Sequence, residues 1–146
     1  MESDEKRVAR RFYDIWSSGK LDTLEEVLAP NFTGHAGASA STVDEYRSTA
    51  AGFLNAFPDL KVEVRHLVQE GDLVSTWVTY TGTHQSDFAG VPASGRAIKC
   101  AGWDLMRLRD GKIVELTSFC DLFTILNSLT SAYQSMRDRS PLANRS

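Results

Sequence analysis

Three ionisable side chains stand beside apolar or small residues, where they could act on a bound molecule. Asp121 directly precedes a run of apolar residues, Asp104 lies within an apolar segment, and His35 lies near small residues. A carboxyl group in an apolar pocket has a raised pKa and exchanges a proton near neutral pH. It could remove a proton next to a carbonyl and return it to the developing oxyanion. The pattern therefore predicts general acid and base chemistry, with these three as candidate catalytic residues.

Each candidate also has a second interpretation. Asp121 could cap the helix predicted after it, a role that is compatible with acid or base work at a cavity mouth. Asp104 could contact the substrate or pair with a buried basic group, and its predicted register lies roughly 13 Å along the strand from that of Asp121, too far to share a proton. His35 could hydrogen-bond a substrate carbonyl, orient Asp121, or lie in a solvated loop.

The other histidines and the aromatic residues are candidates for the wall of a binding site. His66 is predicted at the rim, and His84 in a structural hydrogen bond within a loop. No two histidines have the spacing of metal ligands, so we predict no metal site and no cofactor. Trp103 is predicted on the outer face of a sheet, at a subunit interface. The aromatic residues that could pack in the core or contact a planar substrate are Tyr13, Trp16, Tyr46, Phe53, Phe57, Trp77 and Phe119.

The first half of the chain has helical periodicity. Apolar residues recur at helical spacing from Val8 to Trp16, and Gly19 is expected to end that helix. A short second helix is predicted to end at Pro30, followed by a short strand at 31–35 and a loop to 41. Thr42 and Glu45 fit a capping box for a third helix, which ends before Pro58.

The second half alternates with the period of strands. Strands are predicted at 61–69, 73–83, 96–109 and 113–120, with tight turns at Glu70-Gly71 and Asp110-Gly111. Two-residue turns would place His66 and Trp77 on one face. They would place Asp104 on a face with Phe119 and Asp121. A last helix is predicted after Asp121, extending to Tyr133 and Met136. Helices followed by paired strands indicate an α+β fold.

Length and composition exclude several functional classes. The chain of 146 residues is expected to form one domain over 1–136, with a polar tail at 137–146. A net charge of −3 gives no general attraction to nucleic acid or to an anionic membrane. Two cysteines do not make a disulfide framework, and the acidic N-terminus does not resemble a signal peptide. We therefore expect a cytoplasmic protein that acts on a small molecule.

Several motifs together resemble the SnoaL-like polyketide cyclases. They are Phe57-Pro58-Asp59, Gly82-Thr83-His84, the segment Phe88–Arg96, the segment Arg107–Glu115, and Asp121. The resemblance extends from about Glu5 to Leu129. It implies a cone-shaped barrel in which a curved antiparallel sheet wraps around N-terminal helices and encloses an apolar cavity.

The resemblance also implies an activity without a cofactor. In the cyclases, an aspartate at the position of Asp121 is the general acid and base of an intramolecular aldol closure. Relatives hydroxylate anthracycline-type polyketides, and other proteins of the superfamily only bind small lipophilic molecules. We therefore predict a cyclase of an aromatic polyketide, with a hydroxylase and a binding protein as alternatives. The expected partners are a hydrophobic polycyclic substrate and a second copy of the chain in a homodimer or higher oligomer.

Overall fold

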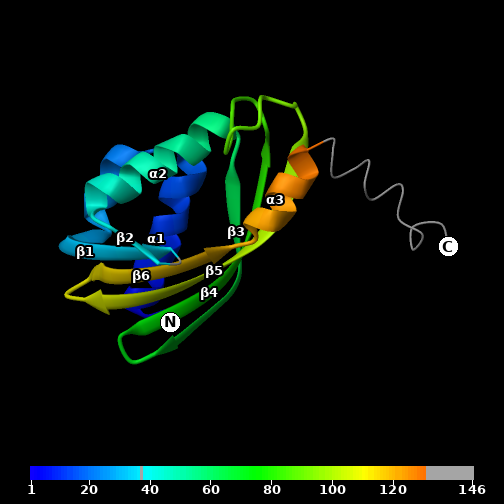
Figure 1. The fold of residues 1–146 in the computed structure, drawn as a ribbon. Coiled ribbons are helices and arrows are strands. Elements are labelled where there is room, and N and C mark those ends of the chain that lie inside the picture. Colours follow the sequence, from blue (N-terminus) through cyan, green and yellow to red (C-terminus); the bar gives the residue numbers. More distant parts are fainter. Residues whose placement is uncertain (37, 131–146) are drawn as a thin grey trace.

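The N-terminal helices form where the sequence predicts them. The computed structural model describes residues 1–36 and 38–130. Helix α1 spans Asp4–Ser18, begins at the Ser3 cap and ends at Gly19, whose φ of 74° suits a residue without a Cβ. Helix α2 spans Val43–Ala56, and Thr42 and Glu45 form the predicted capping box. Figure 1 shows both helices in the hollow of the curved sheet.

The segment after α1 differs from the prediction. A 3-10 helix, η1, covers Leu21–Glu26, and strand β1 already begins at Leu28 and runs to Ala36. Pro30 therefore lies within a strand and does not end a helix. The chain leaves the helical form early because the Val27 carbonyl accepts a hydrogen bond from Ile113 N, which joins this segment to the sheet. Strand β2 (Ser39–Ser41) then pairs with β1.

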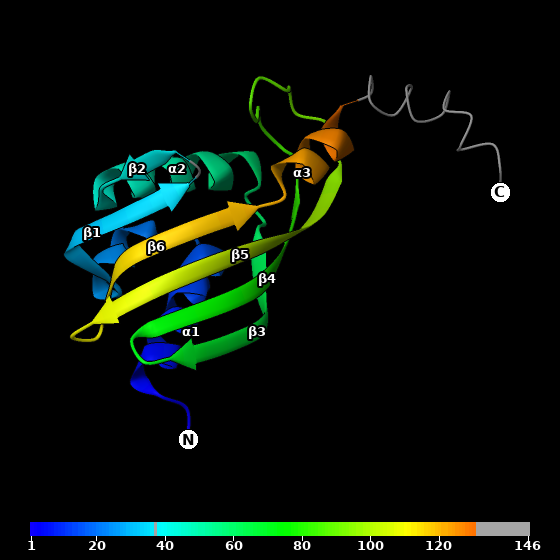
Figure 2. The same ribbon diagram turned by 60° about the horizontal axis from the view of Figure 1, so that its bottom comes forward.

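Six strands form one curved, mixed sheet. The other strands are β3 (Lys61–Glu70), β4 (Leu73–Thr83), β5 (Ala97–Arg109) and β6 (Lys112–Cys120). The order across the sheet is β2-β1-β6-β5-β4-β3, as Figure 2 shows. The expected α+β architecture is confirmed, but the sheet is not wholly antiparallel, because β1 runs parallel to β6. No tight turn joins these two strands, so their relative direction was not fixed by a hairpin.

Two one-residue bulges change which side chains share a face. Between β5 and β6 the register shifts between Arg107 and Leu108, so Asp104 lies opposite Ser118 and Trp103 opposite Phe119. Between β3 and β4 it shifts at Arg65. A shift of one residue exchanges the two faces of a strand. The predicted face that joined Asp104 to Phe119 is therefore wrong.

The core consists of two apolar clusters. The first joins α1 to the middle of the sheet and includes Phe12, Ile15, Val78 and Met106. The second includes Phe57, Leu60, Ile98 and two residues of helix α3 (Leu122–Leu129), which packs against β5. Trp16 and Tyr80 contact both clusters. Both side chains also line a cavity between α2 and the sheet.

The predicted hydrogen bond of His84 is present in the loop between β4 and β5. His84 is fully buried, and its Nδ1 lies 2.8 Å from Ser94 Oγ and accepts a hydrogen bond from Ser94 N. Asp59 fixes the start of the same loop by accepting from Thr83 N and Thr83 Oγ1. The predicted helical residues Tyr133 and Met136, and the predicted tail, lie outside the described residues. Within the described residues, no helix is long and apolar enough to cross a membrane.

Candidate active site

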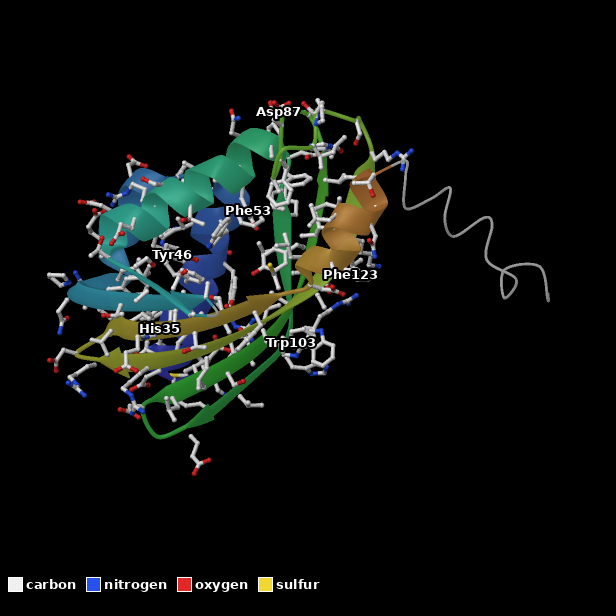
Figure 3. All side chains as sticks on the ribbon, in the orientation of Figure 1. His35, Tyr46, Phe53, Asp87, Trp103 and Phe123 are labelled. Carbon is white, nitrogen blue, oxygen red and sulfur yellow. The ribbon has the colours of Figure 1, made fainter. Side chains whose placement is uncertain are left out.

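A cavity of about 230 Å³ lies between α2 and the concave face of the sheet. Most of its wall is apolar, and residues of both core clusters contribute to it. Figure 3 shows Tyr46 and Phe53 pointing from α2 toward the sheet. The lining residues from the helices and the loop after α2 are Trp16, Tyr46, Thr49, Phe53, Leu60 and Ile125; those from the strands include Gly34, Tyr80, Ile98, Asp104, Leu116, Ser118 and Cys120.

Asp104 is the only carboxylate among the described residues that line this cavity. Its side chain is 5% exposed, and its Oδ2 accepts a hydrogen bond from the hydroxyl of Tyr13. Ser118, which faces it across the register, donates its hydroxyl to the same carboxyl group. Thr76 Oγ1 lies 2.5 Å from Tyr13 Oη. Because Tyr13 has given its single proton to Asp104, Thr76 must be the donor to Tyr13.

Burial determines the acid strength of Asp104. Removal from water raises its pKa above the ordinary value, and the hydrogen bonds from Ser118 and Tyr13 oppose that rise without reversing it. We find no Lys or Arg paired with this carboxyl group among the described residues. A carboxyl group in this setting takes up a proton more readily than one in water, which is the property that a general base for carbon acids needs.

The structure places Asp121 at the start of helix α3. Its Oδ1 accepts from Thr124 N at 3.0 Å and its Oδ2 from Thr124 Oγ1 at 2.5 Å. These hydrogen bonds lower the pKa of Asp121. Its carboxyl group is not part of the cavity wall. The predicted capping role is therefore confirmed, whereas the desolvation that the predicted proton transfer requires is found at Asp104.

His35 and Phe119 lie at the rim of the cavity. In the sheet, His35 pairs with Thr117 and Phe119 pairs with Trp103. Both residues therefore occupy strand positions whose side chains point away from the helices. Phe119 is 60% exposed. Both border the cavity, but neither side chain occupies its interior. Contact of either residue with a ligand stays a prediction, limited to the part of the ligand near the opening.

His66 and Trp77 share one face, as predicted, but it is the outer face of the sheet, so their predicted place in the cavity wall is wrong. The turn lies at Gly71-Asp72 rather than at Glu70-Gly71, which moves the pairing by two positions and leaves the shared faces unchanged, and the Arg65 bulge lies just before His66 in the chain. His66 therefore pairs with Trp77 on the outer face, where both are exposed. In Figure 3, Trp103 lies on this outer side of the sheet. The centroid of its ring lies 4.9 Å from that of the Trp77 ring.

Tyr13 and Phe57 are buried next to the cavity without lining it. Tyr13 acts on Asp104 from behind the wall, as described above. Phe57 packs in the second core cluster, with its ring 5.2 Å from that of Phe88. Of the predicted binding residues, Trp16, Tyr46 and Phe53 therefore line the interior, and Phe119 lines the rim.

Sequence reasoning missed Tyr80, Ser118 and Cys120 as cavity residues. The bulge between β5 and β6 places Ser118 and Cys120 on the cavity side of the sheet, and a bulge of one residue has no clear sequence signal here. Tyr80 could have been found from the alternation of β4, in which Val74, Thr76 and Val78 are buried. Burial raises the pKa of the Cys120 thiol and raises that of Cys100 to about 12, so neither is an activated nucleophile.

The described residues contain no group of three His, Cys, Asp or Glu side chains that could hold a metal ion. The cavity offers instead a carboxyl group, tyrosine and serine hydroxyls, and an aromatic wall. This combination suits a planar, largely apolar molecule with a few oxygen atoms.

Comparison with known proteins identifies a family. A profile of the family described as SnoaL-like polyketide cyclase matches residues 6–129. A search of functionally curated proteins gives no match.

Solved structures share the fold over most of the chain. A protein from Jannaschia sp. CCS1, provisionally named a SnoaL-like polyketide cyclase, is 26% identical with a TM-score of 0.82, covering 89% of this chain and 94% of its own. AclR from Streptomyces galilaeus, provisionally named a hydroxylase, is 26% identical with a TM-score of 0.80, covering 86% and 94%. IdmH from Streptomyces antibioticus, provisionally named a polyketide cyclase, is 31% identical with a TM-score of 0.77, covering 86% and 97%.

Proposed function

Because the chain belongs to the SnoaL-like polyketide cyclase family, we propose that it closes a ring in an aromatic polyketide or similar keto compound by acid and base catalysis. The observation that carries the proposal is the buried carboxyl group of Asp104 at the wall of an apolar cavity. We assign the proton transfer to Asp104 rather than to Asp121, and the reaction needs no cofactor.

The proposed reaction is an intramolecular aldol addition. Asp104 takes a proton from the carbon next to a carbonyl, which leaves an enolate. That carbon attacks a second carbonyl of the same molecule, so a carbon–carbon bond forms and the carbonyl oxygen becomes an alkoxide. Asp104 then returns its proton to the alkoxide. Its raised pKa favours the first transfer, and Tyr13 and Ser118 hold the carboxyl group in place for both.

The cavity wall would select the substrate. Trp16 and Phe53 lie 6.2 Å apart, with ring planes at 77°, and present aromatic edges and faces to a planar molecule. His35 at the rim would contact an oxygen near the opening. A second molecule of the chain is not needed to complete the described wall, so each subunit would carry its own site.

The experiment offers the protein a set of aromatic keto esters with a free methylene group and separates the products by mass spectrometry. Ring closure appears as a product of unchanged mass, or of the mass less one water. The Asp104→Asn variant should lose the conversion and keep its affinity for the product. Retained turnover in this variant would refute the assignment.

A hydroxylase is the second candidate, and the similarity to AclR favours it. In that case the reduced aromatic substrate itself supplies the electrons: a CH2 group becomes a carbonyl that carries one atom of the labelled dioxygen, and the two hydrogens leave with the other atom as water. Ring closure without label uptake supports the cyclase. Binding without any conversion across the set would leave the protein as a carrier of small lipophilic molecules and would contradict both enzymatic candidates.

A further inference from the structure

Tyr46 has a hydroxyl proton that no described residue uses. Trp16 Nε1 donates to Tyr46 Oη at 3.0 Å. An indole nitrogen can only donate, so the tyrosine oxygen is the acceptor in this bond. The hydroxyl proton must therefore point elsewhere, and no acceptor for it is found within residues 1–36 and 38–130. Because Tyr46 lines the cavity, the structure leaves a fixed donor there.

Tyr80 supplies a second free hydroxyl to the same cavity. Its oxygen makes no hydrogen bond to any residue in the described part of the chain, and its side chain is half-buried at the cavity wall. The ring lies over Gly102, where an added Cβ would overlap Tyr80 Cε2. The glycine thus makes room for this ring position. The only fully buried side-chain polar atom without a partner in the described residues is His84 Nε2, so the Tyr80 hydroxyl is open to the cavity, where a ligand or water can accept its proton.

Both hydroxyl groups remain protonated donors at every physiological pH. Burial raises the pKa of Tyr46 and of Tyr80 far above the ordinary tyrosine value, and the charge of Asp104 raises both further. The two phenols and Asp104 line the same cavity, the phenols as donors and the carboxyl group as the proton acceptor.

We infer that Tyr46 and Tyr80 form a donor pair that holds an acidic oxygen of the ligand, so that the cavity takes planar enols or phenols. This inference rests on the proposed function and adds to it the chemical class of the bound group. The specificity would come from two hydroxyl groups on different elements, one on α2 and one on β4.

The charges balance in such a complex. When Asp104 takes a proton from the ligand, its own negative charge is lost and an equal charge appears on the ligand oxygen. That oxygen then accepts from Tyr46 and Tyr80, which keep their protons. The cavity holds one negative charge before and after the transfer, and the donor pair faces the position where the charge develops.

The test compares two probes that differ in one acidic proton. Para-nitrophenol can become an oxyanion, and its phenolate absorbs at a different wavelength from its phenol, whereas para-nitroanisole cannot ionise. The wild-type protein should bind the phenol more tightly and show the phenolate band at a pH below the probe's own pKa in water. Tyr46→Phe and Tyr80→Phe should each reduce the preference for the phenol by roughly tenfold or more.

Two further variants separate the donor pair from the rest of the wall. Phe53→Leu changes the apolar wall and should weaken both probes alike. Trp16→Phe removes the donor that fixes Tyr46, so the preference for the phenol should fall by a smaller factor than in Tyr46→Phe. Denaturant unfolding of each variant confirms that the fold is intact.

The outcomes distinguish this inference from the proposed function. If both probes bind equally to the wild type, or if the tyrosine variants keep the full preference for the phenol, the donor pair is refuted. The proposed aromatic substrate is not refuted by either result. If neither probe binds, both the donor pair and the proposed aromatic substrate are refuted. A preference that both tyrosine variants reduce, and Phe53→Leu does not, supports the pair.

Discussion

Large aromatic side chains lie on both sides of the sheet, but only those on the inner side accompany a buried carboxyl group. On the inner face, Tyr13 and Ser118 hold Asp104, and Trp16 donates to Tyr46. On the outer face, Trp77, Trp103 and Phe119 form a row across β4, β5 and β6 and remain 44%, 41% and 60% exposed. The same residue types serve two purposes: helices α1 and α2 supply most of those on the inner side, and strand alternation places those on the outer face.

The difference shows how a polar network identifies a reactive site. The side chains of the exposed aromatic row cannot act as an acid or a base. Large exposed apolar patches usually mark association surfaces. The inner face instead contains a carboxyl group whose burial raises its pKa, next to a cavity that admits a ligand. Substitutions on the two faces should therefore affect different properties.

The largest effect should follow loss of the inner carboxyl group. Asp104→Asn keeps the shape of the side chain but cannot accept the substrate proton, so turnover should fall by about a hundredfold or more. The measurement is turnover of whichever keto substrate the wild type converts. Product affinity is the control and should change little. A variant with wild-type turnover would show that the inner network is only structural.

The next largest effect concerns association through the outer face. We propose that a second copy of the chain covers the row of Trp77, Trp103 and Phe119, as the predicted homodimer requires, because one symmetric patch can pair with itself. Trp103→Lys should separate the copies in sedimentation experiments and leave turnover unchanged. A wild-type protein that is monomeric at all concentrations would contradict the proposed dimer.

A third substitution tests the packing of the inner face. In Gly102→Ala the new methyl group collides with the Tyr80 ring, so the unfolding free energy should fall by about 1–3 kcal/mol. Affinity for para-nitrophenol should fall with it. Gly52→Ala is the matched control, because a Cβ there meets nothing within 4 Å and α2 should gain up to about 1 kcal/mol. Equal effects of the two substitutions would contradict the placement of Tyr80.

A pH effect on stability should also come from the inner face. The folded-state pKa of Asp104 lies above its unfolded value, so the folded protein keeps this proton to higher pH. Its contribution to stability is complete below the unfolded pKa and is lost as pH rises through the folded pKa. Asp104→Asn should remove that loss, worth about 1.4 kcal/mol for each unit of raised pKa. Denaturant unfolding of both proteins across this pH range measures it, and parallel curves would refute it.

The smallest effect is expected at Asp121. Asp121→Asn keeps a side-chain oxygen at the start of α3, so turnover should be unchanged and the midpoint of thermal unfolding should fall slightly. The lowered pKa of Asp121 means that its stabilising contribution is present above the unfolded pKa and is lost as pH falls through the folded pKa. A loss of turnover similar to that of Asp104→Asn would return the catalytic role to Asp121.

Local sequence signals predicted the elements well. The capping box at Thr42, the end of α1 at Gly19 and the Asp110-Gly111 turn each depend on a few adjacent residues. The two residues of that turn have φ values of 53° and 77°, which the sequence Asp-Gly favours. Such features need no knowledge of the rest of the fold.

The composition of the site depended on long-range pairing and was only partly predictable. Asp104, Trp16, Tyr46 and Phe53 were predicted and line the cavity, since their strand or helix alternation was clear. Ser118 was missed because the bulge between β5 and β6 shifts their register by one residue. Trp77 was misplaced because the sequence did not show which face of β4 is turned toward the helices, although its sharing of a face with His66 was predicted. Hydrophobic alternation fixes a face within one strand, but it does not fix the pairing between strands.

The central claim is that Asp104, and not Asp121, is the ionisable group that responds to a ligand in the cavity. An NMR titration of the labelled aspartate carboxyl carbons, assigned with Asp104→Asn and Asp121→Asn, measures both groups with and without para-nitrophenol. Asp104 should titrate above the ordinary aspartate range and change its midpoint when the probe binds, while Asp121 titrates below that range and does not respond. A response of Asp121 to the probe, with none at Asp104, would contradict the account.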